Sequence, residues 1–523
     1  MVQRYVYAIH ATLRACEVNI AEPSRHEPLA ERRLGNAGVI ALLGGAQALV
    51  LVAGMARWKI IAILLGPGGV GIAGVIDQTA QLALQIGQLN IPTVSLRFLA
   101  IAQEDQGSRG AAWLYRTLLR AVLSTTALVA AVVTGILLLR PGSLGVETTG
   151  YVAAVAFALA ATPLTAATGL IRNVLATLHR HRAAATTLLM SSLAIAGGSY
   201  VGLRIGGLSG AYLAALIVGL LTAGALHRLV VSALPAASTA RPGSLLALLQ
   251  AHPDIVRFSL TLYAVGFTVP LGYWVVRWKV LQSLGPQSAG FLVAALTLAT
   301  GVRAVFSQAS TQYLLPLASR NLPKEVRAAE VARYVRTLSL LLLLAALPLL
   351  LFPHEVLLVL YSRQFIAAAD VLGVLVLSEV ILAIADAYRM LQLGFNDLAG
   401  FAATTLTGVT ITGIGIWWVV PAFGLRGVAL LQLAVGLVVL MQSIIRVRSR
   451  HRVRVGWRTF AMEMYVISAL AAAALIGRAV PEPGTLHIAA KAAVAALMLT
   501  GGWMLVPAQE RDASWLRLLT RLR

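Results

Sequence analysis

Three arginines stand inside the apolar stretches of this chain, where a charged side chain is costly. Arg57, Arg277 and Arg303 lie among residues that otherwise suit a bilayer interior. A charge at full depth costs about 2.5–3.5 kcal/mol on insertion scales. A guanidinium group holds phosphate through paired hydrogen bonds. We therefore predict that these arginines bind a phosphate-bearing substrate. The alternative for Arg57 and Arg277 is that they reach toward the membrane interface, beside tryptophans that act as interfacial anchors.

Two of these arginines belong to a repeat. Arg-Trp-Lys at 57–59 is followed by Leu-Gly-Pro at 65–67, and Arg-Trp-Lys at 277–279 is followed by Leu-Gly-Pro at 284–286. Each copy sits between apolar stretches long enough to cross a bilayer, so the repeat marks a pair of transmembrane helices. Two homologous membrane halves are typical of transporters that work by alternating access. We predict a pseudo-twofold axis along the membrane normal that relates the halves.

A stripe of glutamines follows the first copy. It consists of Gln78, Gln81, Gln85 and Gln88. Spacings of three and four place them on one helical face, which lipid cannot solvate. Glutamine offers both donors and acceptors to a hydroxyl-rich substrate. The stripe is interpreted as a substrate-binding wall of a water-filled cavity, and the alternative is hydrogen-bonded packing between helices.

Three carboxylates also fall within apolar stretches. Asp77 lies beside the glutamine stripe, and Glu379 and Asp386 lie seven residues apart, on nearly one face of a later helix. A buried carboxylate can take up a proton or help to bind sodium. We predict a role in ion coupling for all three, with H+ and Na+ both open. The alternative for Asp386 is an ion pair with Arg389, three residues further on.

The composition restricts the class of protein. Hydrophobic residues make up 59%, charged residues 12%, and the mean hydropathy is +0.82. We therefore predict an all-α polytopic membrane protein. The single cysteine, Cys16, excludes a disulfide framework, and the histidines show no metal spacing. We expect no metal, no cofactor and no enzymatic activity, since the segments between helices are short and contain no phosphate-binding loop.

Apolar runs predict fourteen transmembrane helices. Their ranges are 37–65, 70–95, 117–139, 149–171, 183–204, 207–227, 258–284, 287–313, 337–353, 366–390, 400–421, 424–445, 460–477 and 487–507. We divide the chain accordingly into five parts. These are a cytoplasmic N-terminal tail at 1–35, a six-helix lobe at 36–230, a cytoplasmic linker at 231–257, a second six-helix lobe at 258–446, and a C-terminal helix pair with a basic tail at 447–523.

The positions of the arginines predict the orientation. Most of them fall on one side when the connecting segments are assigned alternately to the two faces. By the positive-inside rule this side is cytoplasmic, together with both termini. The asymmetry accounts for most of the net charge of +22. Because the basic residues are scattered over short loops, we expect contact with anionic membrane lipids and none with nucleic acid.

Three regions resemble a known family. They are Arg57 to Gly74 with its Leu-Gly-Pro turn; 172–213 with Arg-His-Arg at 180–182 and Gly206-Gly207; and 360–400 with Leu360-Tyr361-Ser362, Gly394 and Asn396. These regions resemble the bacterial polysaccharide flippases of the multidrug/oligosaccharidyl-lipid/polysaccharide exporter superfamily. The resemblance implies two six-helix lobes around a central cavity. It also implies that an undecaprenyl-diphosphate-linked oligosaccharide moves from the inner to the outer leaflet of the bacterial inner membrane, for O-antigen or exopolysaccharide biosynthesis. Glycosyltransferases and a polysaccharide polymerase are the implied partners.

Three other functions stay open. Flippases of the lipid-linked peptidoglycan precursor handle the same diphosphate chemistry. Multidrug or cation antiporters share the fold, but cationic drugs require carboxylates facing the cavity, whereas a lipid diphosphate requires cations. A scaffold of envelope biosynthesis that transports nothing would need no cavity. Solvent labelling of cysteines placed at Gln81 or Gln85 distinguishes it from a transporter.

Overall fold

The computed structural model describes residues 36–140, 151–178, 180–234, 243, 263, 266–319, 323–453, 456–479 and 485–507. Residues 45–523 form one compact unit, and the contacts below lie within it. The tail expected at 1–35, most of the linker expected at 231–257 and the basic tail after 507 lie outside the described residues.

Helices account for nearly all of the described residues, and no strand occurs among them. The first part, called here the N-terminal half, contains α2 (Asn36–Gln88), α3 (Ile91–Leu139), α4 (Val152–Ala160), α5 (Thr162–Thr177) and α6 (His181–Ala233). The C-terminal half contains α10 (Thr268–Ser319), α11 (Lys324–Leu351), α12 (Pro353–Leu360), the 3-10 helix η3 (Arg363–Ala368), α13 (Ala369–Gly394) and α14 (Leu398–Arg450). The helix pair α15 (Trp457–Ala479) and α16 (Thr485–Leu505) follows. The predicted all-α class is confirmed.

Four of the long helices fold back on themselves at a glycine. Gly66 in α2, Gly207 in α6, Gly285 in α10 and Gly424 in α14 have positive φ, which interrupts each helix. Contacts between the two arms show the reversal. In α2, for example, the Arg57 side chain donates to Asp77, twenty residues later. Only glycine readily adopts positive φ with extended ψ, so these positions set the hairpin turns.

Ten helices among the described residues are long and apolar enough to cross a membrane. Since four of them are hairpins, the described residues provide fourteen apolar segments that could cross a membrane, which is the number that hydropathy predicts. The chain is therefore a multi-pass membrane protein. Some bounds differ from the predicted ones by several residues. The second arm of α2, for instance, ends at Gln88 and not at 95, because Leu89 and Asn90 adopt positive φ before Pro92 enters the next helix.

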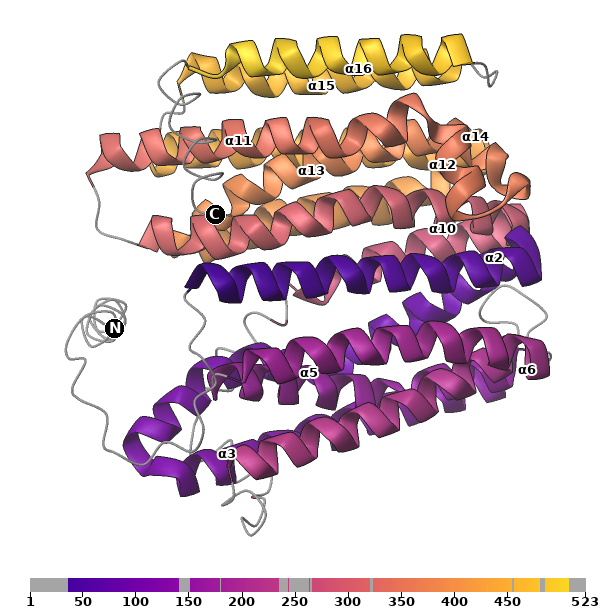
Figure 1. The fold of residues 1–523 in the computed structure, drawn as a ribbon, viewed down its shortest axis with the longest axis vertical. Helices are drawn as coiled ribbons and strands as arrows, with labels where there is room; N and C mark the ends of the chain where they lie inside the picture. Colours follow the sequence, from indigo (N-terminus) through magenta and orange to yellow (C-terminus); the bar gives the residue numbers. More distant parts are fainter. Residues whose placement is uncertain are drawn as a thin grey trace. The chain divides into compact units, whose positions relative to one another are not determined.

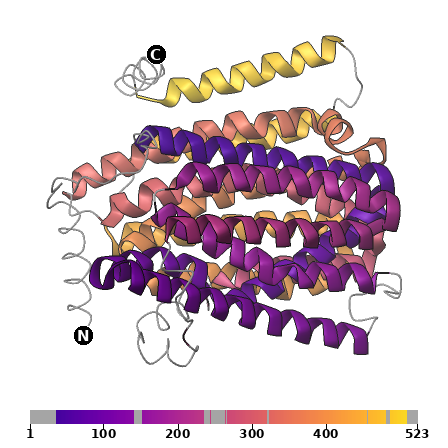
Figure 2. The same ribbon diagram turned by 60° about the horizontal axis from the view of Figure 1, so that its bottom comes forward.

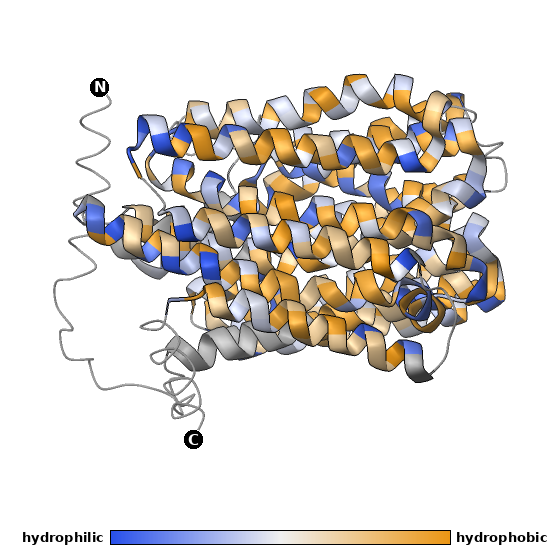
Figure 3. Cartoon of the chain, turned by 90° about the horizontal axis from the view of Figure 1, so that it is seen from above, coloured by the Kyte–Doolittle hydropathy of each residue, from blue (hydrophilic) through white to orange (hydrophobic). Residues whose placement is uncertain are grey.

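Helix α13 is the centre of the C-terminal half. Almost every residue from Ala369 to Leu391 is buried, and α13 packs against α10, α11, α14 and α15. The pair α15 and α16 packs on α11, at the edge of this half (Figures 1 and 2). Gly477 permits the close approach, because a Cβ there would overlap the Leu350 carbonyl oxygen. Apolar residues dominate the outward middle parts of the helices, and polar residues gather toward their ends (Figure 3).

Candidate functional site

The first candidate arginine, Arg57, is held within the N-terminal half. Its guanidinium donates to both carboxylate oxygens of Asp77, at 2.7 and 3.3 Å, and lies over the Tyr212 ring at 5.5 Å. The Tyr212 hydroxyl donates to the same carboxylate at 2.7 Å. The hairpin at Gly66 creates this pairing, since it brings the two arms of α2 side by side. Asp77 therefore balances the charge of Arg57.

The second arginine, Arg277, reaches across to the other half. Its Nη1 donates to the Gly74 carbonyl oxygen on α2 at 3.2 Å, while its buried Nε has no hydrogen-bond partner among the described residues. Repeat-related arginines thus have different surroundings. Both have a buried Nε without a hydrogen-bond partner among the described residues, but Arg57 is paired with a carboxylate, whereas Arg277 donates to a neutral carbonyl oxygen.

Two further hydrogen bonds connect α2 to the first arm of α10. Trp274 Nε1 donates to Thr79 Oγ1 at 3.0 Å, and Gln78 Nε2 donates to the Pro270 carbonyl oxygen at 3.2 Å. Together with Arg277, these contacts join the halves from Gly74 to Thr79. The basic and polar residues of this seam are therefore positioned where the two halves meet.

The four glutamines of the stripe differ in burial and in hydrogen bonding. Gln78 is buried and bonded to the C-terminal half. Gln81 is exposed, and Gln85 and Gln88 are half-buried. Gln88 Nε2 donates to Gln85 Oε1 at 2.7 Å. Three of the four glutamines thus keep amide groups accessible, beyond the point where α2 is bonded to α10.

The third arginine, Arg303, lies in a charged network inside the C-terminal half. Its guanidinium donates through Nε to Asp386 at 2.9 Å and through Nη1 to Glu379 at 3.2 Å. Arg389 Nη1 donates to the other Asp386 oxygen at 2.9 Å. The expected Asp386–Arg389 pair is present, but Asp386 also bonds Arg303, which the spacing along α13 did not indicate.

Polar side chains complete this network. Tyr273 and Gln432 donate to Glu379, at 3.3 and 2.8 Å, and Ser307 donates to Asp386 at 2.7 Å. A small cavity of about 90 Å³ adjoins it, and Tyr273, Arg303, Arg389 and Gln432 are among its lining residues. Sequence reasoning did not identify Tyr273, Gln432 or Ser307. Their only sequence signal is a polar residue in an apolar stretch, which many packing residues share.

The structure therefore divides the candidate residues into two groups. Arg57, Asp77, Arg277 and the glutamines gather on α2 and the facing arm of α10. Arg303, Glu379 and Asp386 form a separate network within the C-terminal half. Two arginines and two carboxylates balance that network, and Asp77 balances Arg57. Among the three candidate arginines, Arg277 is therefore the one for which the described residues provide no hydrogen-bonded carboxylate.

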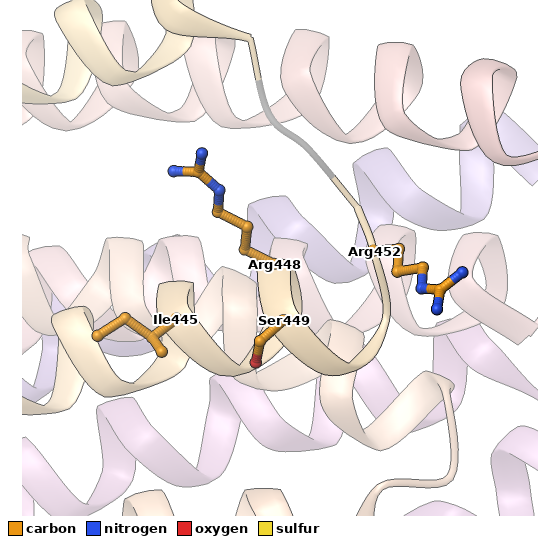
Figure 4. Close-up of a pocket in the computed structure, with 4 residues that line it drawn as sticks. All are labelled: Ile445, Arg448, Ser449 and Arg452. Atoms are coloured by element: carbon orange, nitrogen blue, oxygen red, sulfur yellow. The ribbon is translucent and has the colours of Figure 1, made fainter.

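A basic hollow of about 610 Å³ lies at the end of α14. Ile445, Arg448, Ser449 and Arg452 line it, and both arginines are exposed. Figure 4 shows their guanidinium groups pointing away from each other. They do not converge on one ligand. Scattered arginines at a helix end instead suit contact with anionic headgroups at a membrane surface.

Comparisons with known proteins concern the fold and not the site residues. No family model matches the sequence, and no curated protein matches it. Among solved structures, the lipid II flippase MurJ in an inward closed conformation has a TM-score of 0.69 at 12% identity, over 88% of this chain and 97% of that chain. An inward-facing MATE multidrug resistance transporter of the MOP superfamily has a TM-score of 0.58 at 14% identity, over 83% and 99%.

A MATE transporter from Vibrio cholerae has a TM-score of 0.52 at 16% identity, over 80% of this chain and 99% of that chain. The chain has the fold of these transporters. The likeness spans nearly their whole length, and at these identities it concerns the fold alone. This fold is the one expected from the resemblance in the sequence. None of these three solved structures is described as a polysaccharide flippase.

Proposed function

We propose that this protein is a flippase of the bacterial inner membrane with cytoplasmic termini. Its proposed substrate is an undecaprenyl-diphosphate-linked oligosaccharide for O-antigen or exopolysaccharide biosynthesis, which crosses from the inner to the outer leaflet by alternating access. Glycosyltransferases and a polymerase would supply and consume this substrate. The glutamines at 78, 81, 85 and 88 would contact the sugars while the lipid tail stays in the bilayer.

The surroundings of Arg277 support this proposal most directly. Arg277 lies where the halves meet, carries an unused Nε and is hydrogen bonded only to a carbonyl oxygen among the described residues. A buried guanidinium without a hydrogen-bonded carboxylate is costly, and a ligand anion that accepts its free donor would lower that cost. A lipid diphosphate supplies this anion. A cationic drug would instead meet a positive group, since Asp77 is already engaged by Arg57 and Tyr212.

The lipid II flippase fold supports a second candidate. The TM-score of 0.69 to MurJ exceeds the values for the two MATE transporters described above. A lipid-linked peptidoglycan precursor carries the same diphosphate, so the arginines do not separate the two substrates. The sugar headgroup does, and the accessible glutamines are the residues that would contact it.

Binding of undecaprenyl diphosphate to purified protein tests the shared chemistry. We expect Arg277→Ala to weaken binding by about ten- to one hundred-fold, because charge-assisted hydrogen bonds are lost. Arg277→Lys should recover only part, since a point charge replaces the guanidinium fork. The matched control is Arg204→Ala, because Arg204 is exposed and lies over Tyr200. Equal binding by wild type and Arg277→Ala would contradict the assignment.

Transport assays then identify the headgroup. Cells lacking the protein should lose surface glycan, and Arg57→Ala and Arg277→Ala should reduce it without loss of protein from the membrane. Proteoliposomes loaded with an undecaprenyl-diphosphate-linked oligosaccharide or with lipid II compare the two substrates directly. Preference for lipid II would establish the second candidate, and movement of neither would reject both.

Ion coupling is proposed for the same three carboxylates. Glu379 is the favoured one, because among the described residues its carboxylate accepts from one guanidinium, whereas that of Asp386 accepts from two. Protonation of Glu379 would remove one of the acceptors that hold Arg303. Asp77 is coupled to the substrate site through Arg57. Transport rates in H+ and Na+ gradients, with Glu379→Gln as the variant, distinguish the two ions.

A further inference from the structure

We propose that the two Gly-Pro turns and Lys59 form a gate that closes the transport pathway at the end where both turns lie. This inference rests on the proposed alternating access, and the arginine distribution predicts that this end is extracytoplasmic. It assigns a function to the residues of the repeat other than its arginines.

The turns contact each other reciprocally. A Cβ on Gly71 would overlap the Pro286 carbonyl oxygen, and a Cβ on Gly290 would overlap the Pro67 carbonyl oxygen. Each contact is therefore the counterpart of the other under the repeat. Because both turns meet at one end, the two hairpins point in the same direction, as a pseudo-twofold axis along the membrane normal requires. Inverted repeats would place the turns at opposite ends.

Glycine is needed at this contact because backbone approaches backbone. The ideal Cβ position of Gly71 lies 2.7 Å from the Gly290 nitrogen, nearer than real Cβ atoms come. About one helical turn further, a Cβ on Gly74 would overlap the Val293 side chain. Any larger residue at 71 or 290 must therefore separate the halves at the turns. Such separation is what opening at this end requires.

Lys59 supplies a polar latch beside the turns. Its Nζ donates to the Val359 carbonyl oxygen on α12 at 2.6 Å, which joins the two halves. The repeat-related Lys279 differs, because its Nζ lies 4.7 Å from the centroid of the Trp417 ring in its own half. One lysine of the repeat thus bridges the halves while the other stays within one. Lys279 is consequently a matched control.

The segment that receives Lys59 covers the first turn. After α12, η3 brings Gln364 to Gly66, where a Cβ would stand 2.9 Å from the Gln364 Oε1 atom. Phe365 anchors η3, because it is fully buried and its ring packs at 84° to the ring of Phe291 on α10. The first turn is therefore enclosed between the second turn and this anchored segment. Lys59 and Gly66 must leave their partners when the halves part here.

A disulfide across the gate tests the proposal. The Cβ position of Gly68 lies 3.8 Å from Pro286 Cβ, which matches the mean Cβ separation of about 3.8 Å in disulfides. In protein with Cys16 replaced, Gly68→Cys with Pro286→Cys should cross-link on oxidation. Cross-linking should stop transport, and reduction should restore it. Gly54→Cys with Pro286→Cys is the control, since Gly54 lies in the same helix with no atom near its Cβ position.

Gate variants then test Lys59 and Gly71 by the rate of that cross-link. Lys59→Met should lower the rate by about two- to ten-fold, as expected for the loss of one hydrogen bond, and Lys279→Met should leave it unchanged. Gly71→Leu should lower it further, and Gly54→Leu should not. Equal rates for Lys59→Met and Lys279→Met would overturn the latch, even if Gly71→Leu failed to fold.

The cross-link is measured without substrate, so the two proposals can fail separately. Lack of the disulfide in protein that transports the glycan would overturn the gate and leave the proposed substrate standing. Cross-linking that responds to Lys59→Met in protein that moves no lipid-linked glycan would support the gate and reject the substrate.

Discussion

Asp386 receives donors from three residues on two oxygens. Arg303, Arg389 and Ser307 all donate to it, and it is 7% exposed. Removing one member of a buried ion pair typically costs about 3–5 kcal/mol, because the remaining charge is uncompensated. We expect Asp386→Ala to lower the melting temperature of the purified protein strongly, and Asp386→Asn to lower it less, because the amide oxygen still accepts.

Asp370 offers the matched control for that prediction. It pairs with Arg426 at 3.0 Å, but both side chains are more than half exposed. Exposed pairs are worth about 0–1 kcal/mol. The melting temperature of Asp370→Ala should therefore be close to that of the wild type. If Asp386→Ala melted there as well, the network would contribute nothing to stability.

We predict that Asp397, which lies outside the membrane spans, stabilises the folded protein by an amount that is lost in acid. Arg446 donates to both of its oxygens, at 2.8 and 3.0 Å, which lowers the pKa of the carboxyl below its usual range. A lowered folded pKa means that the stabilisation is complete above the unfolded value and is lost as the pH falls toward the folded value. The difference in melting temperature between wild type and Asp397→Asn should therefore be constant near neutral pH and shrink below about pH 4. A difference that grew in acid would contradict this sign.

For single residues, the sequence could not predict which side chains would pair with each other. The cost of burial identified Arg57, Arg277 and Arg303 as unusual. It could not reveal that Arg303 bonds Asp386 and Glu379, because these residues lie 83 and 76 positions away along the chain. The i,i+3 pair of Asp386 with Arg389 was predictable, since helical geometry alone brings such neighbours together.

At the scale of elements, the positive φ of the turn glycine in α6 predicts that a side chain there lowers stability. Gly207 has φ of 58° and ψ of −144° with open space around its Cβ position. Gly207→Ala should cost about 1–3 kcal/mol from backbone strain alone. Gly197→Ala is the control, since it lies within a regular part of the same helix with equal space, and it should stabilise by about 1 kcal/mol. Equal melting temperatures for both variants would show that the turn tolerates a side chain.

The hairpins were predictable as pairs of spans because hydropathy and length decide which segments cross a bilayer. Their bounds were less predictable. Continuous helical hydrogen bonding extends past the apolar run, as at α11, which begins at Lys324 although the apolar stretch begins near 337. Charged residues in that first part are compatible with a helix that continues into the interfacial region.

For the whole molecule, the sequence repeat carried more information than composition. Membrane class follows from composition, but only the repeat predicted two parallel halves, and the reciprocal contacts of Gly71 and Gly290 fit that expectation. The conformational state was not predictable, since under the proposed alternating access one sequence encodes more than one state. In this structure hydrogen bonds join the halves from the region of the turns to Thr79.

This state predicts a graded accessibility along the glutamine stripe. With Cys16 replaced, single cysteines at 81, 85 and 88 should react with a membrane-impermeant thiol reagent applied from the cytoplasmic side, because these positions lie beyond the bonded seam. A cysteine at 78 should be protected, because Gln78 is buried against Pro270. Opening at the turns would break that contact. The same cysteine should then react from the opposite side in the Gly71→Leu variant.

Measuring both stability and transport in glutamine variants distinguishes a stripe that lines a transport cavity from one that only packs helices together. If the glutamines only join helices, each side-chain hydrogen bond that is removed costs about 0.6 kcal/mol. Changing Gln81 and Gln85 together to Leu should then affect stability and transport alike. If they line the pathway, transport should fall while the melting temperature changes little. Unreactive cysteines at all four positions, in wild type and in Gly71→Leu, with loop controls that do react, would leave the stripe structural. A cysteine at 78 that is protected in the wild type and reacts from the opposite side in Gly71→Leu requires a pathway through the seam between α2 and α10, because Gln78 is buried at that seam in this structure.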